Sequence, residues 1–240
     1  MFKQSLLAIL LLSGSGAALA EKGALRMIAP LNQAMPLAQF SKEKLSGGIL
    51  KDLGDALAQR LGRQADYISV AGDQVGAALA ARKADGVCYV RPFWIDGDFH
   101  WSRPLIPDAE LVASVPGAPP VRSLIDLRDR PVGTVASYRY PRMEQVLGLR
   151  FIRDNSPTME ENLAAIRRGD VQHAVLGRAI LDYQHKLDPA LALRADLVIA
   201  SFAAQCAFIR HGNISTREID RALDAMVADG TVDAILARYR

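Results

Sequence analysis

Short apolar runs alternate along the first third of the chain with stretches in which apolar residues recur every three or four positions. The runs are typical of buried strands and the recurring positions are typical of amphipathic helices. Strands are expected at residues 25–29, 67–70 and 86–90. One helix is expected between Gly48 and Gly62, and a second from Asp73, as its N-cap, through Leu79. This β-α-β-α-β order predicts right-handed crossovers and a parallel sheet, with functional loops at the carboxyl ends of its strands.

A second alternating series follows the Pro- and Gly-rich stretch 115–120, which predicts a loop and a boundary between two lobes. Capping boxes at Thr158 and Ser215 predict the starts of two helices, the second of which stops at Gly230. The other expected helices are 141–148, 180–187 and 232–239, and the expected strands are 131–135, 173–176, 197–200 and 206–209. The whole pattern predicts an α/β protein with two lobes.

The first twenty residues have the pattern of a secretory signal peptide. Lys3 precedes an apolar run at residues 6–12, and the small residues Ala18 and Ala20 precede a cleavage point after Ala20. The apolar run is shorter than the roughly 20 residues that span a bilayer, which disfavours the alternative of an uncleaved anchor. The exported chain would therefore begin at Glu21 and reside in the periplasm.

Composition excludes several classes of protein. The 240 residues are 50% hydrophobic and 23% charged, which excludes a disordered chain and a multi-span membrane protein. The net charge of +3 is spread along the chain without a polybasic tail, so no nucleic-acid partner is expected. Cys88 and Cys206 both lie in apolar, strand-like segments, which favours buried free cysteines, although export would also permit a disulfide between them.

Searches for catalytic motifs find no phosphate-binding loop, paired-cysteine metal spacing or nucleophile elbow. The four histidines are scattered and lack the spacing of metal ligands. We therefore expect no cofactor, no metal and no catalytic residues.

Several short segments follow one another in a characteristic order: Leu25-Arg26-Met27 with Pro36-Leu37, 48–53 continuing to 60–62, 83–87, 101–105, 124–128 before 132–135, and 222–240. Taken together, they resemble the family 3 extracellular solute-binding proteins, which are two-lobed periplasmic receptors that mostly hand amino acids to importers. The resemblance implies the type II periplasmic binding fold, in which each lobe is a mixed sheet flanked by helices. It also implies two hinge crossovers, near residues 110–116 and 196–204.

The resemblance also implies how the lobes are assembled. Residues 21–112 and 201–240 would form lobe one, and residues 113–200 would form lobe two. A ligand would bind between the lobes, which would close about the hinge. The strands that contain Cys88 and Cys206 would both lie in lobe one, which keeps the disulfide open as an alternative to free thiols.

The chain departs from the family at the ligand site. In amino-acid binders of the family, an aspartate at the end of a lobe-two strand binds the ligand's ammonium group, and a lobe-one arginine binds its carboxylate. This chain has Gly177 in place of the aspartate. The usual spacing of the arginine is also lost, although Arg91 lies nearby in the sequence. Without an anionic partner, a buried ammonium is costly, so we expect a small anionic or aromatic ligand. The candidate ligand-binding residues are Asn32, Gln33, Met35, Arg91, Trp94, Ser137, Tyr138, Arg139 and Arg178.

Each candidate also has a simpler interpretation. The arginines are the kind of side chain that is solvated or paired at a surface, and Trp94 and Trp101 are the kind that packs within a lobe. The expected function is capture of the ligand by a monomer that presents it to an ABC-type importer or a membrane sensor.

Two alternatives remain open. One is a cyclohexadienyl dehydratase-like enzyme on the same scaffold, with Asp96, Asp98 and His100 as its ionisable cluster, although the sequence favours a solvated turn there. The other is an accessory protein of a periplasmic oxidoreductase or signalling receptor.

Overall fold

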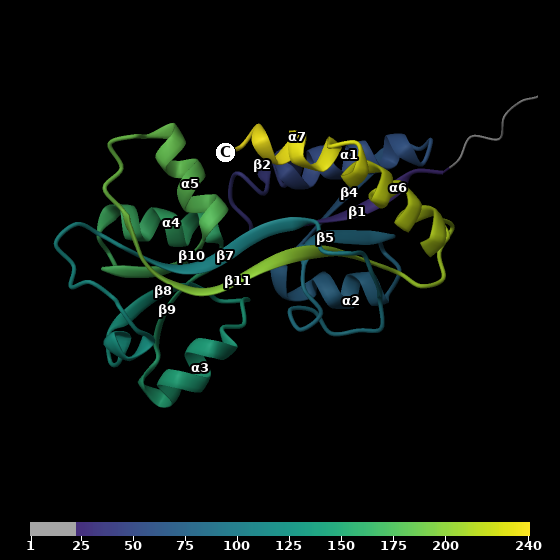
Figure 1. Ribbon diagram of the computed structural model, residues 1–240. Coiled ribbons are helices and arrows are strands. Elements are labelled where there is room, and N and C mark those ends of the chain that lie inside the picture. Colours follow the sequence, from purple (N-terminus) through teal and green to yellow (C-terminus); the bar gives the residue numbers. More distant parts are fainter. Residues whose placement is uncertain (1–22) are drawn as a thin grey trace, which may run out of the picture.

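The computed structural model describes residues 23–240, which form two lobes joined by two long strands (Figure 1). The predicted signal peptide and its cleavage point lie outside the described residues. Strands β7 (Ile106–Ser114) and β11 (Arg194–Phe208) pair antiparallel and run from one lobe into the other. The predicted α/β, two-lobed architecture is confirmed, whereas the exact lobe boundaries remain predictions.

The sheet of lobe one is mixed. Strand β1 pairs in parallel with β4 and β5, and β5 pairs antiparallel with the end of β11. Helix α2 covers one face, while α1, α6 and α7 pack together on the other (Figure 1). The elements of this lobe are β1 (Leu25–Pro30), α1 (Ile49–Arg60), β4 (Ala65–Val70), α2 (Val75–Ala80), β5 (Gly86–Val90), α6 (Thr216–Ala228) and α7 (Thr231–Ala237).

The sheet of lobe two is also mixed. Strand β8 pairs in parallel with β9 and β10, and β10 pairs antiparallel with β7. Helices α4 and α5 lie on one side of this sheet and α3 on the other (Figure 1). Its elements are β8 (Pro131–Val135), α3 (Pro141–Leu147), β9 (Ile152–Ser156), α4 (Met159–Arg168), β10 (His173–Gly177) and α5 (Arg178–Leu187).

Some local predictions were wrong. Asp73 lies inside a short 3-10 helix, η1 (Gly72–Gln74), and Gln74 rather than Asp73 is the N-cap of α2. Strands β7 and β9 were not predicted, nor were the short strands β2 (Gln39–Ser41), β3 (Lys44–Gly47) and β6 (His100–Trp101). The other short helices are η2 (Leu124–Leu127) and η3 (Gly148–Arg150).

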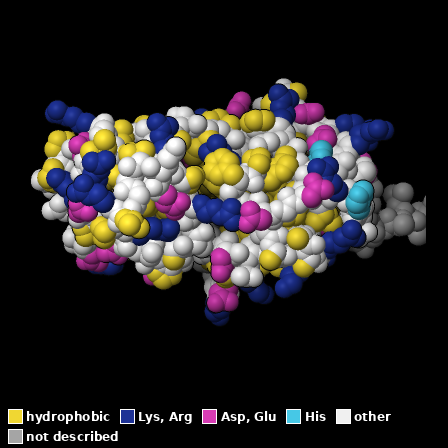
Figure 2. All heavy atoms as spheres, turned by 90° about the horizontal axis from the view of Figure 1, so that it is seen from below, with side chains coloured by type: hydrophobic (Ala, Val, Ile, Leu, Met, Phe, Trp, Pro, Cys, Tyr) yellow, Lys and Arg dark blue, Asp and Glu magenta, His cyan; other side chains and the backbone are white. Residues whose placement is uncertain are grey.

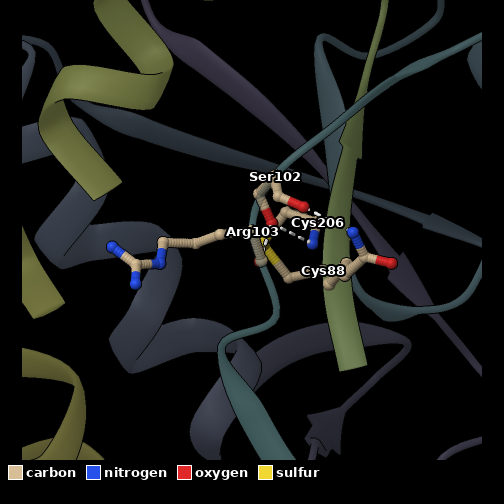
Figure 3. The surroundings of a disulfide bond; sticks show 5 residues. Cys88, Ser102, Arg103 and Cys206 are labelled. Carbon is tan, nitrogen blue, oxygen red and sulfur yellow. Dashed lines mark hydrogen bonds between the residues drawn. A yellow bond between two sulfur atoms is a disulfide. The ribbon is translucent and has the colours of Figure 1, made fainter. Parts of the chain in front are cut away.

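Cys88 and Cys206 form a disulfide, so the favoured prediction of free thiols was wrong. The two residues are direct partners on the antiparallel strands β5 and β11, with their Cα atoms 3.9 Å apart. Ser102 lies beside the bridge, where its hydroxyl accepts a hydrogen bond from the amide of Cys206 at 2.9 Å (Figure 3). The disulfide therefore crosslinks the lobe-one sheet at the strand that continues into lobe two.

Charge on the surface is mixed. On the face shown in Figure 2, basic and acidic side chains are interspersed with apolar ones. Many arginines pair with acidic neighbours, as Arg150 does with Asp129 and Arg210 with Asp98. Within residues 23–240, no helix combines the length and the apolar character that crossing a bilayer requires.

Candidate functional site

A cavity of about 110 Å³ lies between the lobes, beside the long strands β7 and β11. Its wall is largely apolar and aromatic, with Tyr89, Trp94, Tyr138 and Phe202 among the lining residues. Loops that follow β1, β5 and β8 contribute to it, so the carboxyl ends of these strands meet at the cavity.

The structure gathers many of the predicted ligand residues at this cavity. Ligand contact by any of them remains a prediction. The predicted residues that line the cavity are Asn32, Gln33, Trp94, Ser137, Tyr138 and Arg139, and those that do not are Met35, Arg91 and Arg178.

Asn32 connects the two lobes. It is 6% exposed, its side-chain amide donates to the Ser137 hydroxyl at 2.8 Å, and its backbone carbonyl accepts from the Met159 amide at 2.9 Å. The Oδ1 atom of Asn32 and the Oε1 atom of Gln33 are buried without hydrogen-bond partners. Because buried polar atoms are nearly always paired in folded proteins, these two oxygens are candidates to accept hydrogen bonds from a ligand.

Arg139 is held by an ion pair at the rim of the cavity. Its guanidinium donates to both oxygens of Asp96 and, at 3.2 Å, to the carbonyl of Phe93. The side chains are 53% and 83% exposed, and the Arg139 hydrogen bond lowers the pKa of Asp96. This pair bridges lobe two to lobe one, and much of the charge of Arg139 is already compensated.

Arg91 and Arg178 lie away from the cavity wall. The Arg91 guanidinium stacks on aromatic rings, 4.2 Å from the centroid of Phe93 and 5.0 Å from that of Phe202. Burial lowers its pKa from the usual value. Arg178 lines a second hollow of about 590 Å³ and lies 3.9 Å from Asp182 on the next turn of α5.

Glu110 lines the cavity from β7 and was not among the predicted site residues. It is the direct partner of Gly177 on β10 and of Ala200 on β11. Burial raises the pKa of the Glu110 carboxyl to about 7, while the charge of Arg91 opposes this shift. Alternation of polar and apolar positions around Glu110 is the signal that could have indicated it, once β7 had been recognised as a strand.

The side chain of Asp108 lies next to Gly177. A Cβ atom at Gly177 would lie 3.3 Å from Oδ2 of Asp108. The Asp108 carboxylate accepts hydrogen bonds from the Tyr89 hydroxyl and, at 3.0 Å, from the Ala179 amide at the start of α5. An acidic side chain, Asp108, therefore lies close to the position where the family resemblance implies an aspartate. Its carboxylate, however, already accepts hydrogen bonds from donors within the protein.

Tyr89 reaches Asp108 from a strained backbone position. Its φ angle is 60°, in the left-handed region that non-glycine residues rarely adopt, and the register of β5 against β11 shifts between Gln205 and Cys206. Such strain is frequent at ligand sites, where it aims a side chain that a regular strand would direct elsewhere.

The proposed ionisable cluster does not converge on the cavity. Asp96 pairs with Arg139, Asp98 with Arg210, and His100 with Asp220 at 2.7 Å. None of these three predicted residues lines the cavity. In the described structure, the three candidates for catalysis thus belong to three separate pairs, two of them ion pairs with arginines and one a hydrogen bond between His100 and Asp220.

Comparison with known proteins identifies the fold. No protein-family model and no curated protein matches the sequence. An ancestral arginine-binding protein bound to arginine aligns with a TM-score of 0.75 at 20% identity, covering 91% of this chain and 98% of that one. The arginine-, lysine-, histidine-binding protein ArtJ from Geobacillus stearothermophilus aligns with a TM-score of 0.73 at 18% identity, covering 90% and 94%.

A third solved structure is an ancestral amino acid-binding protein, AncCDT-1, described as a precursor of cyclohexadienyl dehydratase. It aligns with a TM-score of 0.75 at 18% identity, covering 91% of this chain and 95% of that chain. At these identities the likeness establishes the fold, which is that of the two-lobed periplasmic amino-acid-binding proteins.

Proposed function

We propose that this chain, with the fold of two-lobed periplasmic binding proteins, is a periplasmic solute-binding protein that captures a small molecule between its lobes. The observation that carries the proposal is the aromatic cavity between the lobes, into which both lobes contribute polar side chains. Buried, mostly apolar cavities with a few polar groups are the usual form of small-molecule sites. An ABC-type permease or a membrane sensor would receive the loaded protein.

An amino acid is the ligand class that we favour. The sequence alone favoured an anionic or aromatic ligand, because Gly177 replaces the family's aspartate and three arginines lie near the expected cleft. Arg139 is paired with Asp96, however, and Arg91 and Arg178 do not line the cavity. The solved structures of similar fold include proteins that bind arginine, lysine or histidine, which supports an amino acid for this chain.

A thermal-shift screen of residues 21–240 against the twenty L-amino acids and a set of organic acids tests the proposal. A ligand at 100 times its dissociation constant adds about 2.7 kcal/mol to stability. For a chain of this size, that corresponds to a rise in melting temperature of roughly 5–10 °C. Absence of a shift with every compound would contradict capture of these ligands.

An enzyme on the same scaffold is the second candidate. The observation in its favour is the Glu110 carboxyl, whose pKa near 7 is in the range of a general acid or base. Similarity to a structure described as a precursor of cyclohexadienyl dehydratase also points to this chemistry. Incubation of the purified chain with prephenate, followed by product detection, distinguishes it from a binding protein, for which no turnover is expected.

A further inference from the structure

Glu110 gives the cavity a negative charge that is only partly compensated, because Arg91 acts on it through space. Among the described residues that line the cavity, Glu110 is the acidic one and Arg139 the basic one. Arg139 is engaged by Asp96 at the rim. The charge that remains to be balanced inside the cavity is therefore that of the Glu110 carboxylate.

The Glu110 carboxylate has no hydrogen-bond or ion-pair partner among the described residues. Within residues 23–240, no side chain or amide approaches it within hydrogen-bond or ion-pair distance, and Arg91 acts on it through space. The hydroxyls of Tyr89 and Tyr140 also interact with it electrostatically, but both are neutral at physiological pH. The Tyr89 hydroxyl donates to Asp108 and the Tyr140 hydroxyl accepts from the Val135 amide. Glu110 is half-buried, and a carboxylate that is partly removed from water without a bonded partner is costly. A cation that enters the cavity would therefore form the ion pair that the protein itself does not supply.

The rest of the wall suits a ligand that donates hydrogen bonds. Oδ1 of Asn32 and Oε1 of Gln33 are buried acceptors without partners. Tyr89 contributes an aromatic ring, whose face attracts cations, whereas the rings of Trp94 and Phe202 already lie beside the Arg91 guanidinium. Acceptors and π-systems together favour ammonium or guanidinium groups and disfavour anions.

We infer that Glu110 binds a cationic nitrogen of the ligand and thereby selects ammonium- or guanidinium-bearing molecules over their neutral and anionic analogues. This inference rests on the proposed function, because it assumes that a small molecule occupies the cavity. It replaces the expectation of an anionic ligand that the sequence suggested.

Ligand capture should then depend on pH near neutrality. Burial raises the pKa of Glu110 to about 7, so the ionised fraction falls about tenfold for each pH unit below that value. A ligand that requires the ionised form loses apparent affinity by the same factor. Between pH 7.5 and pH 5.5 we expect at least a tenfold weakening, which Glu110→Gln should abolish.

Isothermal titration of residues 21–240 with matched ligands tests the inference. Each L-amino acid that binds is compared with its α-hydroxy acid, which lacks the ammonium group. L-Arginine and L-lysine are also compared with L-citrulline and L-norleucine, which lack the side-chain cation. Wild-type protein, Glu110→Gln and the control Glu160→Gln are titrated in parallel, because Glu160 is an exposed residue of α4 outside the cavity.

We expect at least one analogue that lacks a cation to bind wild-type protein tenfold or more weakly than its parent. In Glu110→Gln the parent should weaken by at least tenfold and the difference between parent and analogue should shrink, whereas Glu160→Gln should match wild type. Equal binding of parents and analogues, or an unchanged affinity in Glu110→Gln, would overturn the inference and leave the proposed function intact. Binding of no compound to wild-type protein would contradict both.

Discussion

At the scale of single residues, burial opposes the charge of Glu110. The pKa of this carboxyl is about 7 in the folded protein, well above its ordinary value of 4.5. Below about pH 4.5 the carboxyl is mostly protonated in both the folded and the unfolded chain, so its ionisation hardly changes the free energy of unfolding. As the pH rises towards 7, the unfolded chain ionises first, and the folded state loses stability relative to it.

Replacement Glu110→Gln should therefore stabilise the ligand-free protein at alkaline pH and not at acidic pH. We expect a gain of roughly 1–3 kcal/mol at pH 8 and little difference at pH 4.5. Urea denaturation of wild type and variant at both pH values measures this, with Glu160→Gln as a control. A difference between Glu110→Gln and wild type that does not change with pH would contradict the burial of the charge.

Gly72 leaves room for Asn32. A Cβ atom at Gly72 would lie 1.9 Å from Nδ2 of Asn32, so Gly72→Ala must displace the side chain that bonds to Ser137. We expect Gly72→Ala to weaken binding of a captured amino acid by tenfold or more in a calorimetric titration. Gly23→Ala, where the added methyl meets only a contact at 4.0 Å, is the matched control. Wild-type affinity in Gly72→Ala would show that the position of Asn32 is not critical.

At the scale of elements, sequence patterns predicted the helices better than the strands. Thr158 accepts from the Glu161 amide and Ser215 from the Glu218 amide, as their capping motifs predicted, because capping is decided within a few residues. Strand β9 (Ile152–Ser156) has mostly polar, exposed positions at the edge of the sheet, and therefore lacks the apolar run of a buried strand.

The candidate site was predictable only in part, for a related reason. Asn32, Ser137 and Tyr138 lie on loops after parallel strands, where local patterns and the general rule for such sheets indicate function. Glu110 lies within β7, whose position against Gly177 and Ala200 depends on pairing with residues far away in the chain. One sequence does not reveal such pairing.

The disulfide joins β5 to β11 across 118 residues of chain. Closing a loop of that length restricts the unfolded chain, and loss of a native disulfide typically costs 2–5 kcal/mol. We expect reduction with dithiothreitol, or the double substitution Cys88→Ala with Cys206→Ala, to lower the free energy of unfolding by about this amount. The guanidinium concentration at the midpoint of unfolding should fall accordingly. If the midpoint of the oxidised protein equals that of the reduced protein, the crosslink is absent or has no effect on stability.

At the scale of the whole molecule, two kinds of contact hold the lobes together across the cavity. The bond between Asn32 and Ser137 is partly buried, whereas the pair between Arg139 and Asp96 is largely exposed. Exposed ion pairs contribute about 0–1 kcal/mol and are screened by salt. The contact between the lobes across the cavity should therefore depend more on Asn32 than on the ion pair.

Comparison of Asn32→Ala with Asp96→Asn tests this difference. We expect Asn32→Ala to weaken binding of a captured amino acid at least tenfold, and Asp96→Asn to weaken it less than about fivefold. Small-angle scattering should show a larger radius of gyration for Asn32→Ala, consistent with a greater open population. The reverse order of effects would assign closure to the rim ion pair.

Hydrogen exchange measured by mass spectrometry, with and without each amino acid, tests the central claim most directly. A ligand bound between the lobes should protect residues 30–37 and 89–95 of lobe one together with residues 137–140 of lobe two and the cavity-lining part of β7 around Glu110. The exposed edge formed by β9 should not change. Protection confined to one lobe, or no protection with any amino acid, would contradict capture of an amino acid between the lobes.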